Sequence, residues 1–194
     1  MYRDDNPYSP ARLADRAEIQ DVMFRWCRAI DRLDYEAIRE VFHPDAIDYH
    51  GAYQGGVDGL IEWIRDRHRP IPFSMHLVGN LLIEFTGPDD AMVETYCLAM
   101  QRYPASGRTA LTGLVGDMPA NDSWASDLIV PARYVDHFRR IDGRWRIQTR
   151  HVAFDSVMLV DAPGAGPLDS DRLELGRRDR QDVIYRMRET AGLE

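Results

Sequence analysis

Apolar residues recur every three or four positions in the first part of the chain. Ser9 and Pro10 favour a helix start, and the spacing continues from there to Leu33, which predicts one long amphipathic helix. Its apolar positions are Leu13, Ile19, Val22, Met23, Trp26, Cys27, Ile30 and Leu33. A shorter helix is expected over residues 35–42, between Asp34 as its cap and Pro44. Residues 47–49 suggest a brief strand, Gly55 and Gly56 a turn, and residues 60–69 a third helix that ends before Pro70.

The apolar period changes to two at Phe73, which predicts a long strand over residues 73–85. On a regular strand, one face would carry Phe73, Met75, Leu77, Leu81, Ile83 and Phe85, and the other Ser74, His76, Asn80 and Glu84. Further strands are expected over residues 91–103, 129–141 and 144–158, the last two joined by an Asp142-Gly143 hairpin. Helices followed by long antiparallel strands favour an α+β fold, with the helices on one face of a strongly curved sheet that encloses a pocket.

Three segments organise the chain around that fold. Residues 1–10 are expected to form an N-terminal arm, residues 11–158 the cone-shaped domain, and residues 159–194 a linker and a tail. Within the tail, residues 169–194 could form one charged helix. Inside the domain, residues 104–127 form an unusually long connection between strands. The candidate pocket lining, each residue of which could equally be plain core, comprises Met23, Trp26, Phe42, Trp63, Tyr96, Met100 and Phe154.

Composition narrows the classes of function. A net charge of −8 and a pI near 5.2 argue against nucleic-acid binding, which needs clustered basic residues. All 24 basic residues are arginine, so the chain has no lysine for a Schiff base or a phosphate-binding loop. No apolar run is long enough to span a bilayer and the start of the chain is polar, so we expect a cytoplasmic protein that does not bind membranes. Cys27 and Cys97 form no metal-binding or disulfide pattern and are expected in the core.

Asp31 and His76 are the main candidates for chemistry. Asp31 lies near the end of the first helix at the edge of its apolar face, and a structural role as a helix-end aspartate fits this position equally. His76 lies within an apolar strand, where a buried imidazole needs a hydrogen-bond partner. A carboxylate would fix its tautomer and raise the basicity of the other ring nitrogen, although many buried histidines are merely satisfied structural groups.

Three segments carry a resemblance to a known family. LADRAEIQDVMFRWCRAID ending at Asp31, SMHLVGN around His76, and ARYVDHFRRIDGRWRI resemble the SnoaL-like branch of the nuclear transport factor 2-like superfamily. Within it, the chain looks most like scytalone dehydratase, the bile acid dehydratases and hexachlorocyclohexane dehydrochlorinase. The resemblance covers residues 11–158 and implies a cone-shaped α+β fold. It does not fix the activity, because the superfamily also holds cyclases, isomerases, epoxide hydrolases, dioxygenase subunits and non-catalytic binders.

The resemblance also implies roles for single residues. In the dehydratases and the dehydrochlorinase, a helix-end aspartate orients a strand histidine that removes a proton, and these positions match Asp31 and His76. An assisting arginine matches Arg133, which would face the pocket only if a bulge interrupts the strand alternation. Trp26 stands where the family often has a lysine or tyrosine, and Tyr49 could supply the missing help to the leaving group, or could be a core aromatic.

These observations predict a cofactor-independent lyase, of the dehydratase or dehydrohalogenase type, acting on a small, largely apolar molecule, cyclic compounds included. An isomerase or cyclase with the same dyad and a non-catalytic binding or assembly module remain alternatives. No metal is expected, because the other histidines show no ligand spacing; these are His43, His50, His68, His137 and His151. A homo-oligomer, dimer or trimer, is expected through the outer sheet face, because three helices cannot cover so many apolar strands.

Overall fold

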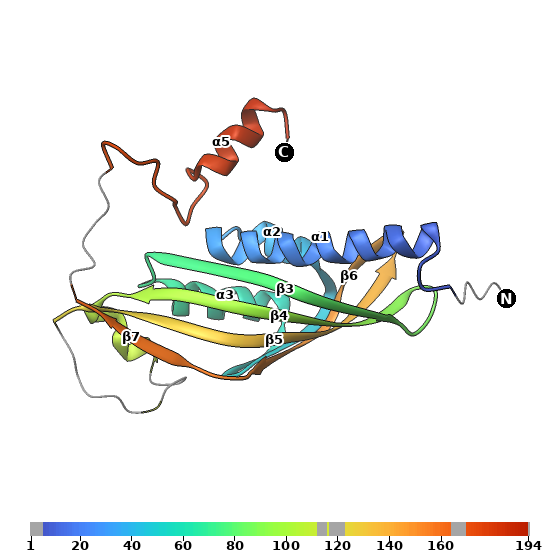
Figure 1. Ribbon diagram of the computed structural model, residues 1–194, viewed down its shortest axis with the longest axis horizontal. Helices are drawn as coiled ribbons and strands as arrows, with labels where there is room; N and C mark the ends of the chain where they lie inside the picture. The colour runs from blue at the N-terminus through green and yellow to red at the C-terminus, as the bar shows by residue number, and fades with distance from the viewer. Residues whose placement is uncertain (1–5, 112–115, 117–122, 164–169, 194) are drawn as a thin grey trace.

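The first helix is as long as its apolar pattern predicts. In the computed structural model, which describes residues 6–111, 116, 123–163 and 170–193, α1 spans Pro10–Arg32 (Figure 1). The Ser9 side chain accepts a hydrogen bond from the Arg12 backbone N–H and so caps the first turn. Leu33 adopts a left-handed conformation, with φ of 53°, and its backbone N–H bonds to the Ala29 carbonyl, which ends the helix.

The segment after α1 places two further helices around a short strand pair. α2 spans Tyr35–Val41 and α3 spans Val57–His68. Between them, β1 (Phe42–His50) begins directly after α2, earlier than expected, and β2 (Tyr53–Gly56) pairs back on it. The two glycines expected in a turn therefore lie in β2, and Gly56 precedes the first residue of α3.

The long strands follow in the second half of the chain. They are β3 (Phe73–Phe85), β4 (Asp90–Tyr103), β5 (Ala125–Ile141), β6 (Arg144–Phe154) and β7 (Met158–Ala162). A short 3-10 helix at Ala105–Leu111 follows β4, within the connection expected to be irregular, most of whose remainder lies outside the described residues. The last predicted strand is divided into β6 and β7, both of which pair with β5.

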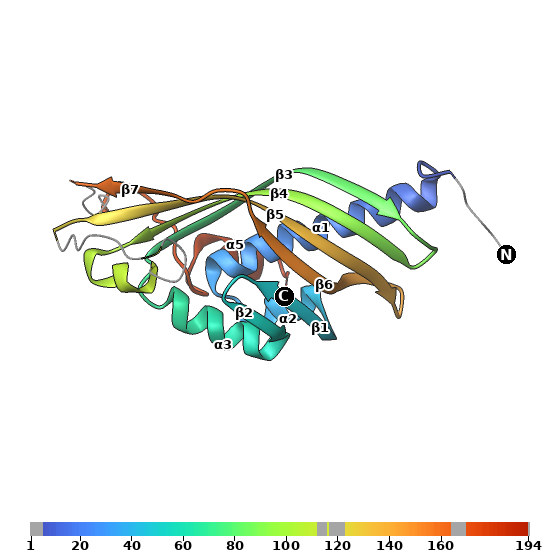
Figure 2. The same cartoon turned by 90° about the horizontal axis from the view of Figure 1, so that it is seen from below.

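One curved sheet contains all seven strands. Its order is β2-β1-β6-β5-β4-β3, with β7 pairing the first part of β5. Among the described strands, β1 and β6 form the one parallel pair, so the expected mainly antiparallel sheet is confirmed. Figure 2 shows the sheet curling from β3 round to β1 and β2, with α1 lying along its concave side. The α+β cone predicted from the sequence is therefore the observed fold.

The two faces of β3 exchange part-way along the strand. Val78 pairs with Cys97 but Leu81 pairs with Thr95, so β3 has one extra residue at a bulge between them. Ser74 and His76 face the helices before the bulge, and Leu81, Ile83 and Phe85 face them after it. The expectation of one continuous apolar face is wrong, because Phe73, Met75 and Leu77 lie on the exposed outer face.

The tail does not form the single helix expected over residues 169–194. Among the described residues of the tail, only α5 (Val183–Thr190) is helical, and residues 170–182 form turns, bends and irregular chain before it. Tyr185 donates a hydrogen bond from its hydroxyl group to Asp34 Oδ2, at 2.9 Å. Asp182 caps α5, is 2% exposed, and lies 3.3 Å from Arg32 Nε. The tail is thus fastened to the end of α1 and the start of α2.

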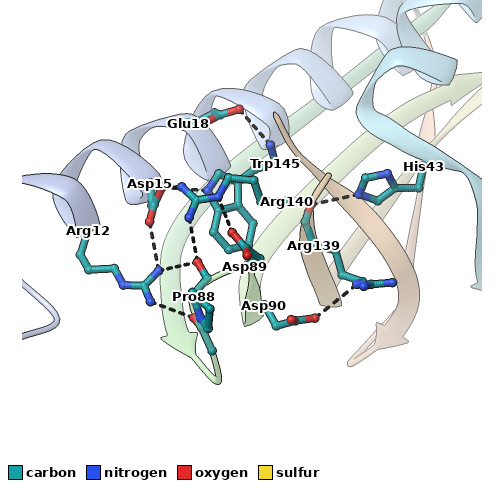
Figure 3. Close-up of polar contacts among 11 residues, drawn as sticks. Arg12, Asp15, Glu18, His43, Pro88, Asp89, Asp90, Arg139, Arg140 and Trp145 are labelled. Atoms are coloured by element: carbon teal, nitrogen blue, oxygen red, sulfur yellow. Dashed lines mark hydrogen bonds and ion pairs between the residues drawn. The ribbon is translucent and has the colours of Figure 1, made fainter. Parts of the chain in front are cut away.

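The opposite end of α1 is fixed by buried Asp15 (Figure 3). Its Oδ1 accepts hydrogen bonds from Arg140 Nη1 at 2.8 Å and from Trp145 Nε1 at 2.9 Å. Its Oδ2 accepts from Arg12 Nη1 at 3.0 Å, and Arg12 Nη2 also donates to the Gly87 carbonyl at 2.8 Å. These contacts join α1 to the β3–β4 and β5–β6 turns, so α1 is held at both ends.

Candidate active site

Asp31 occupies the last turn of α1 and points at β3. Its Oδ1 accepts hydrogen bonds from Ser74 Oγ at 2.9 Å and from His76 Nδ1 at 2.7 Å. Its Oδ2 accepts from the His76 backbone N–H at 2.8 Å. The residue is 7% exposed, so the carboxylate is surrounded by donors rather than by water. The direct carboxylate–imidazole contact expected from the sequence is present.

His76 is held by one ring nitrogen and free at the other. Its Nδ1 is the atom facing Asp31, so a proton on Nδ1 makes a charge-assisted hydrogen bond and leaves Nε2 with its lone pair. Nε2 has no hydrogen-bond partner among the described residues. This tautomer is the one a general base requires.

The electrostatic environment keeps Asp31 ionised. Burial raises the pKa of its carboxyl group, but the hydrogen bonds and charge of His76 and the hydrogen bond from Ser74 outweigh burial, so the pKa lies below its ordinary value. A carboxylate that stays charged can stabilise an imidazolium on His76 after proton transfer.

Arg178 from the tail closes this end of the domain, and no pattern in the sequence indicated this contact. Its guanidinium donates to the backbone carbonyls of Asp31 at 3.0 Å, Ile71 at 3.0 Å and Ile30 at 3.1 Å. Its Nη2 also lies 3.0 Å from His68 Nδ1. Burial lowers the pKa of Arg178 to about 10, and nearby Asp31 opposes that shift. Arg178 remains a cation at neutral pH and holds the helix end that carries Asp31.

The arginine that enters the interior is Arg150 on β6. It is fully buried and donates to Asp136 from Nε at 2.8 Å and from Nη2 at 2.7 Å. Its guanidinium lies 4.3 Å from the ring centre of Tyr134 and 4.7 Å from that of Trp26. A bulge on β6 turns Arg150 inward. Phe138 pairs with residue 147 while the preceding residue of β5 pairs with residue 149, so β6 has one extra residue at this point. Side chains of β6 after the bulge therefore face the side opposite to the one that strict alternation would give them.

Arg133 and Tyr49 point away from the dyad, contrary to expectation. The β5 alternation is unbroken, because the bulge lies on β6, so Arg133 is on the outer face. There it contacts Glu94 at 2.7 Å and Asp155 at 3.0 Å. Tyr49 stacks on His151, with ring centres 4.2 Å apart, on the same outer face. Neither side chain is positioned to assist at Asp31 and His76.

The expected pocket lining divides into three groups. Met23, Trp26 and Phe42 are buried core residues. Tyr96 and Met100 lie on the outer face of β4, so their expected place in a pocket is wrong. The remaining two residues flank His50, whose ring centre lies 5.3 Å from that of Trp63 and 6.3 Å from that of Phe154.

Two surface grooves lie away from the dyad. One, of about 540 Å³, runs between α1, α2, the start of β6 and α5, and charged side chains form most of its walls. The other, of about 480 Å³, is formed by residues 170–177. Neither includes Asp31 or His76, so the expected position at the floor of a large apolar pocket is not found in these grooves.

The remaining candidate groups have structural surroundings. Burial raises the pKa of Cys27 to about 12 and that of Cys97 to about 11, so both thiols stay neutral in the core. His43 Nε2 lies 3.0 Å from the Arg139 carbonyl, and His137 Nε2 lies 3.0 Å from Asp90 at the surface. Within the described ranges, no group of three or more metal-ligating side chains could hold an ion, and no helix is long and apolar enough to cross a membrane.

Comparison with known proteins identifies the family. The model of the SnoaL-like domain matches residues 11–151. The chain belongs to the SnoaL-like domain family. An uncharacterized Mycobacterium tuberculosis protein is 32% identical over 99 residues, which are 48% of this chain and 65% of that relative. The match thus spans slightly less than two thirds of the relative's length.

Solved structures agree on the fold of this SnoaL-like protein. A hexachlorocyclohexane dehydrochlorinase from Novosphingobium barchaimii superposes with a TM-score of 0.63 at 18% identity, covering 82% of this chain and 97% of that one. A candidate scytalone dehydratase from Novosphingobium aromaticivorans gives 0.61 at 18%, covering 81% and 98%. At such identities the likeness establishes the nuclear transport factor 2-like fold.

Proposed function

We propose that this protein is a lyase of the dehydratase or dehydrohalogenase type that acts on a small, largely apolar molecule without a cofactor. The observation that carries the proposal is the state of His76: Nδ1 contacts a buried, ionised carboxylate, and Nε2 has no partner among the described residues. Membership of the SnoaL-like family and the likeness to a dehydrochlorinase and a candidate dehydratase support it.

In the proposed reaction, His76 Nε2 removes a proton from a carbon next to an activating group. Asp31 stabilises the imidazolium that forms. The neighbouring carbon then loses halide, or loses a hydroxyl group that takes the proton from the imidazolium and leaves as water, and the electron pair of the broken C–H bond forms the double bond. General base catalysis of this kind contributes about 100- to 10,000-fold. The short contact of 2.7 Å between His76 Nδ1 and Asp31 holds the imidazole in one orientation, which supports a role in positioning as well as charge.

An isomerase remains the second candidate, because the same base could return its proton to another carbon of the substrate. Arg133 and Tyr49, the groups expected to help a leaving group depart, face outward, and this favours isomerisation unless another donor faces the interior. The two reactions differ in product mass, since elimination releases water or halide and isomerisation does not.

The test separates base chemistry from departure of a leaving group. A panel of cyclic β-hydroxy ketones and their β-chloro analogues is incubated in deuterium oxide, and exchange of the proton next to the carbonyl and formation of enone are followed by NMR and mass spectrometry. The wild-type protein should catalyse both, and His76→Gln should lose both by about 100-fold or more.

His137→Gln is the matched control, because His137 also contacts a carboxylate but lies at the surface. Retention of exchange and elimination in His76→Gln, or their absence from the wild-type protein across the panel, would refute the proposal.

A further inference from the structure

The tail contacts the short stretch of chain that carries Asp31. Arg178 donates from Nε to the Asp31 carbonyl at 3.0 Å and from Nη2 to the Ile30 carbonyl at 3.1 Å. Both carbonyls belong to the last turn of α1, where carbonyls have no partner within the helix. The Asp34 backbone N–H does not cover them, because it bonds to the Ala29 carbonyl. Arg178 therefore supplies hydrogen bonds that the end of α1 lacks.

The same guanidinium reaches the chain that leads into β3. Its Nη1 donates to the carbonyl of Ile71, which is buried, at 3.0 Å. Ile71 lies three residues before Ser74, and Pro72 between them has a ring that fixes one backbone angle and stiffens the link. Ser74 and His76 are the residues of β3 that bond to Asp31. One guanidinium thus joins the two segments that carry the two halves of the dyad.

A fourth contact ties the guanidinium to α3. Arg178 Nη2 lies 3.0 Å from Nδ1 of His68, the last residue of α3. Burial lowers the pKa of His68 well below its ordinary value, so its imidazole is neutral and has a lone pair that can accept. The planar Arg178 side chain cannot turn away from any one of these acceptors without losing bonds to the others.

Three further side chains of the tail hold the residues on either side of the helix end. Arg180 and Tyr185 both contact the Asp34 carboxylate, at 3.1 Å and 2.9 Å. Asp182 is buried and lies 3.3 Å from Arg32 Nε. These contacts attach the tail close to the dyad aspartate and keep the guanidinium in place.

We infer that Arg178 is a positioning residue of the active site, which sets the separation between Asp31 and His76 by joining the backbone segments that carry them. Its effect on turnover rests on the proposed lyase function, whereas its effect on the dyad rests on contacts within the protein. The tail lies outside residues 11–151, the range that the family model matches, so the matched domain does not contain this residue. Release of the tail should lower turnover without any change in the two residues of the dyad.

The expected defect follows from the geometry of the dyad. His76 Nδ1 lies 2.7 Å from Asp31 Oδ1, so a small shift of the α1 end breaks a contact that also orients the imidazole. Arg178→Ala should lower kcat on the active compound of the panel by about 100-fold, the cost of misplacing a catalytic group by about 1 Å. KM should change only a few-fold, because every nitrogen of the Arg178 guanidinium is bonded to the protein itself.

Arg140→Ala is the matched control, because Arg140 holds the opposite end of α1. It donates to Asp15 at 2.8 Å and to the Pro88 carbonyl at 3.0 Å. Asp15 lies about 24 Å from Asp31 along the helix axis, at about 1.5 Å per residue. Arg140→Ala should lower the free energy of unfolding but leave kcat unchanged. A loss of kcat as large as in Arg178→Ala would overturn the inference, because stability rather than position would then control turnover.

Two measurements separate positioning from a general loss of structure. Millimolar guanidinium, far below the concentrations that unfold proteins, should restore part of the kcat of Arg178→Ala, because the free ion can donate to the same carbonyls. It should not restore His76→Gln. Proton NMR of the wild-type protein should show the His76 Nδ1 proton shifted far downfield by its hydrogen bond to Asp31. This resonance should move or vanish in Arg178→Ala and stay in place in Arg140→Ala.

Full kcat in Arg178→Ala would overturn the positioning role and leave the lyase function intact. Arg178→Lys carries the same test if the alanine variant does not fold. A single ammonium cannot replace the planar fork of a guanidinium, so this variant should also lose kcat, and full kcat in it would overturn the role. A wild-type protein that is inactive across the panel would remove the lyase function. The His76 resonance would then decide alone, and an unchanged resonance in Arg178→Ala or Arg178→Lys would overturn the positioning role.

Discussion

Replacing Asp31 by asparagine should separate stability from catalysis. Asparagine has the same shape but presents one oxygen and one NH₂ group to three donors. The His76 backbone N–H cannot become an acceptor, so the amide oxygen should face it, in the place of Oδ2. The NH₂ group then faces Ser74 Oγ and His76 Nδ1, both of which can accept if the hydroxyl rotates and the imidazole changes tautomer.

Because every polar group keeps a partner, the free energy of unfolding should fall by only about 1 kcal/mol, the difference between charged and neutral hydrogen bonds. For a chain of this size that lowers Tm by about 2–4 °C. Catalysis should fall far more, by about 10,000-fold, because the changed tautomer carries its proton on Nε2, where the base must accept one. Thermal unfolding and turnover of the active panel compound measure the two effects.

The pH dependence of the same variant gives an independent check. The pKa of Asp31 is lower in the folded protein than its ordinary value of about 3.9, so its stabilising effect is fully present above that value and is lost as the pH falls below it. The stability difference between wild-type and Asp31→Asn should therefore shrink in acid. A difference that stays constant from about pH 7 to about pH 3, together with full turnover in the variant, would contradict the assignment of Asp31 as an ionised partner of His76.

Four further predictions concern the arginines and the outer face. Arg178→Ala should lower the free energy of unfolding by about 2–4 kcal/mol, because it leaves buried backbone carbonyls unpaired. Arg180→Ala removes only an exposed ion pair and should lower it by less than about 1 kcal/mol in the same denaturant titration. Equal losses in the two variants would refute the role of the tail. Arg150→Ala should lower the free energy of unfolding by about 3–5 kcal/mol, because it leaves the buried carboxylate of Asp136 without its counter-charge. Arg133→Ala should leave turnover unchanged, because Arg133 lies on the outer face. A loss of turnover in Arg133→Ala would contradict that placement. Leu77 is 61% exposed on the outer face, through which we expect copies of the chain to associate. Leu77→Glu should therefore shift a dimer or trimer to monomer in sedimentation. A wild-type protein that sediments as a monomer at micromolar concentration would reject self-association.

The sequence predicts the helices and strands well where their apolar pattern is long and unbroken. α1 and β3 were each located to within one residue of their observed ends, because a sustained period identifies the element type. The orientation of side chains within a strand is harder to predict. The apolar residues of β3 keep a period of two on either side of the bulge, although they face outward before it and inward after it. The sequence pattern therefore shows no sign of the bulge.

The candidate site followed from the family resemblance more than from spacing. A helix-end aspartate and a strand histidine are each common structural groups, and only the resemblance paired Asp31 with His76. The contact made by Arg178 could not be predicted, because its partners are backbone carbonyls at a distant helix end and any residue type presents such a carbonyl.

The bulge on β6 makes the charge of the protein interior depend on how that strand pairs with β5. With the extra residue at position 148, Arg150 points inward and neutralises Asp136. Regular pairing of the same residues without the bulge would put Arg150 opposite residue 135 and turn it outward, which would leave Asp136 buried without its partner although no charged residue had changed. Deleting residue 148 would instead remove the bulge and keep Arg150 opposite Asp136, so alignments of such chains have to place gaps in β6 by the direction of the arginine rather than by residue identity.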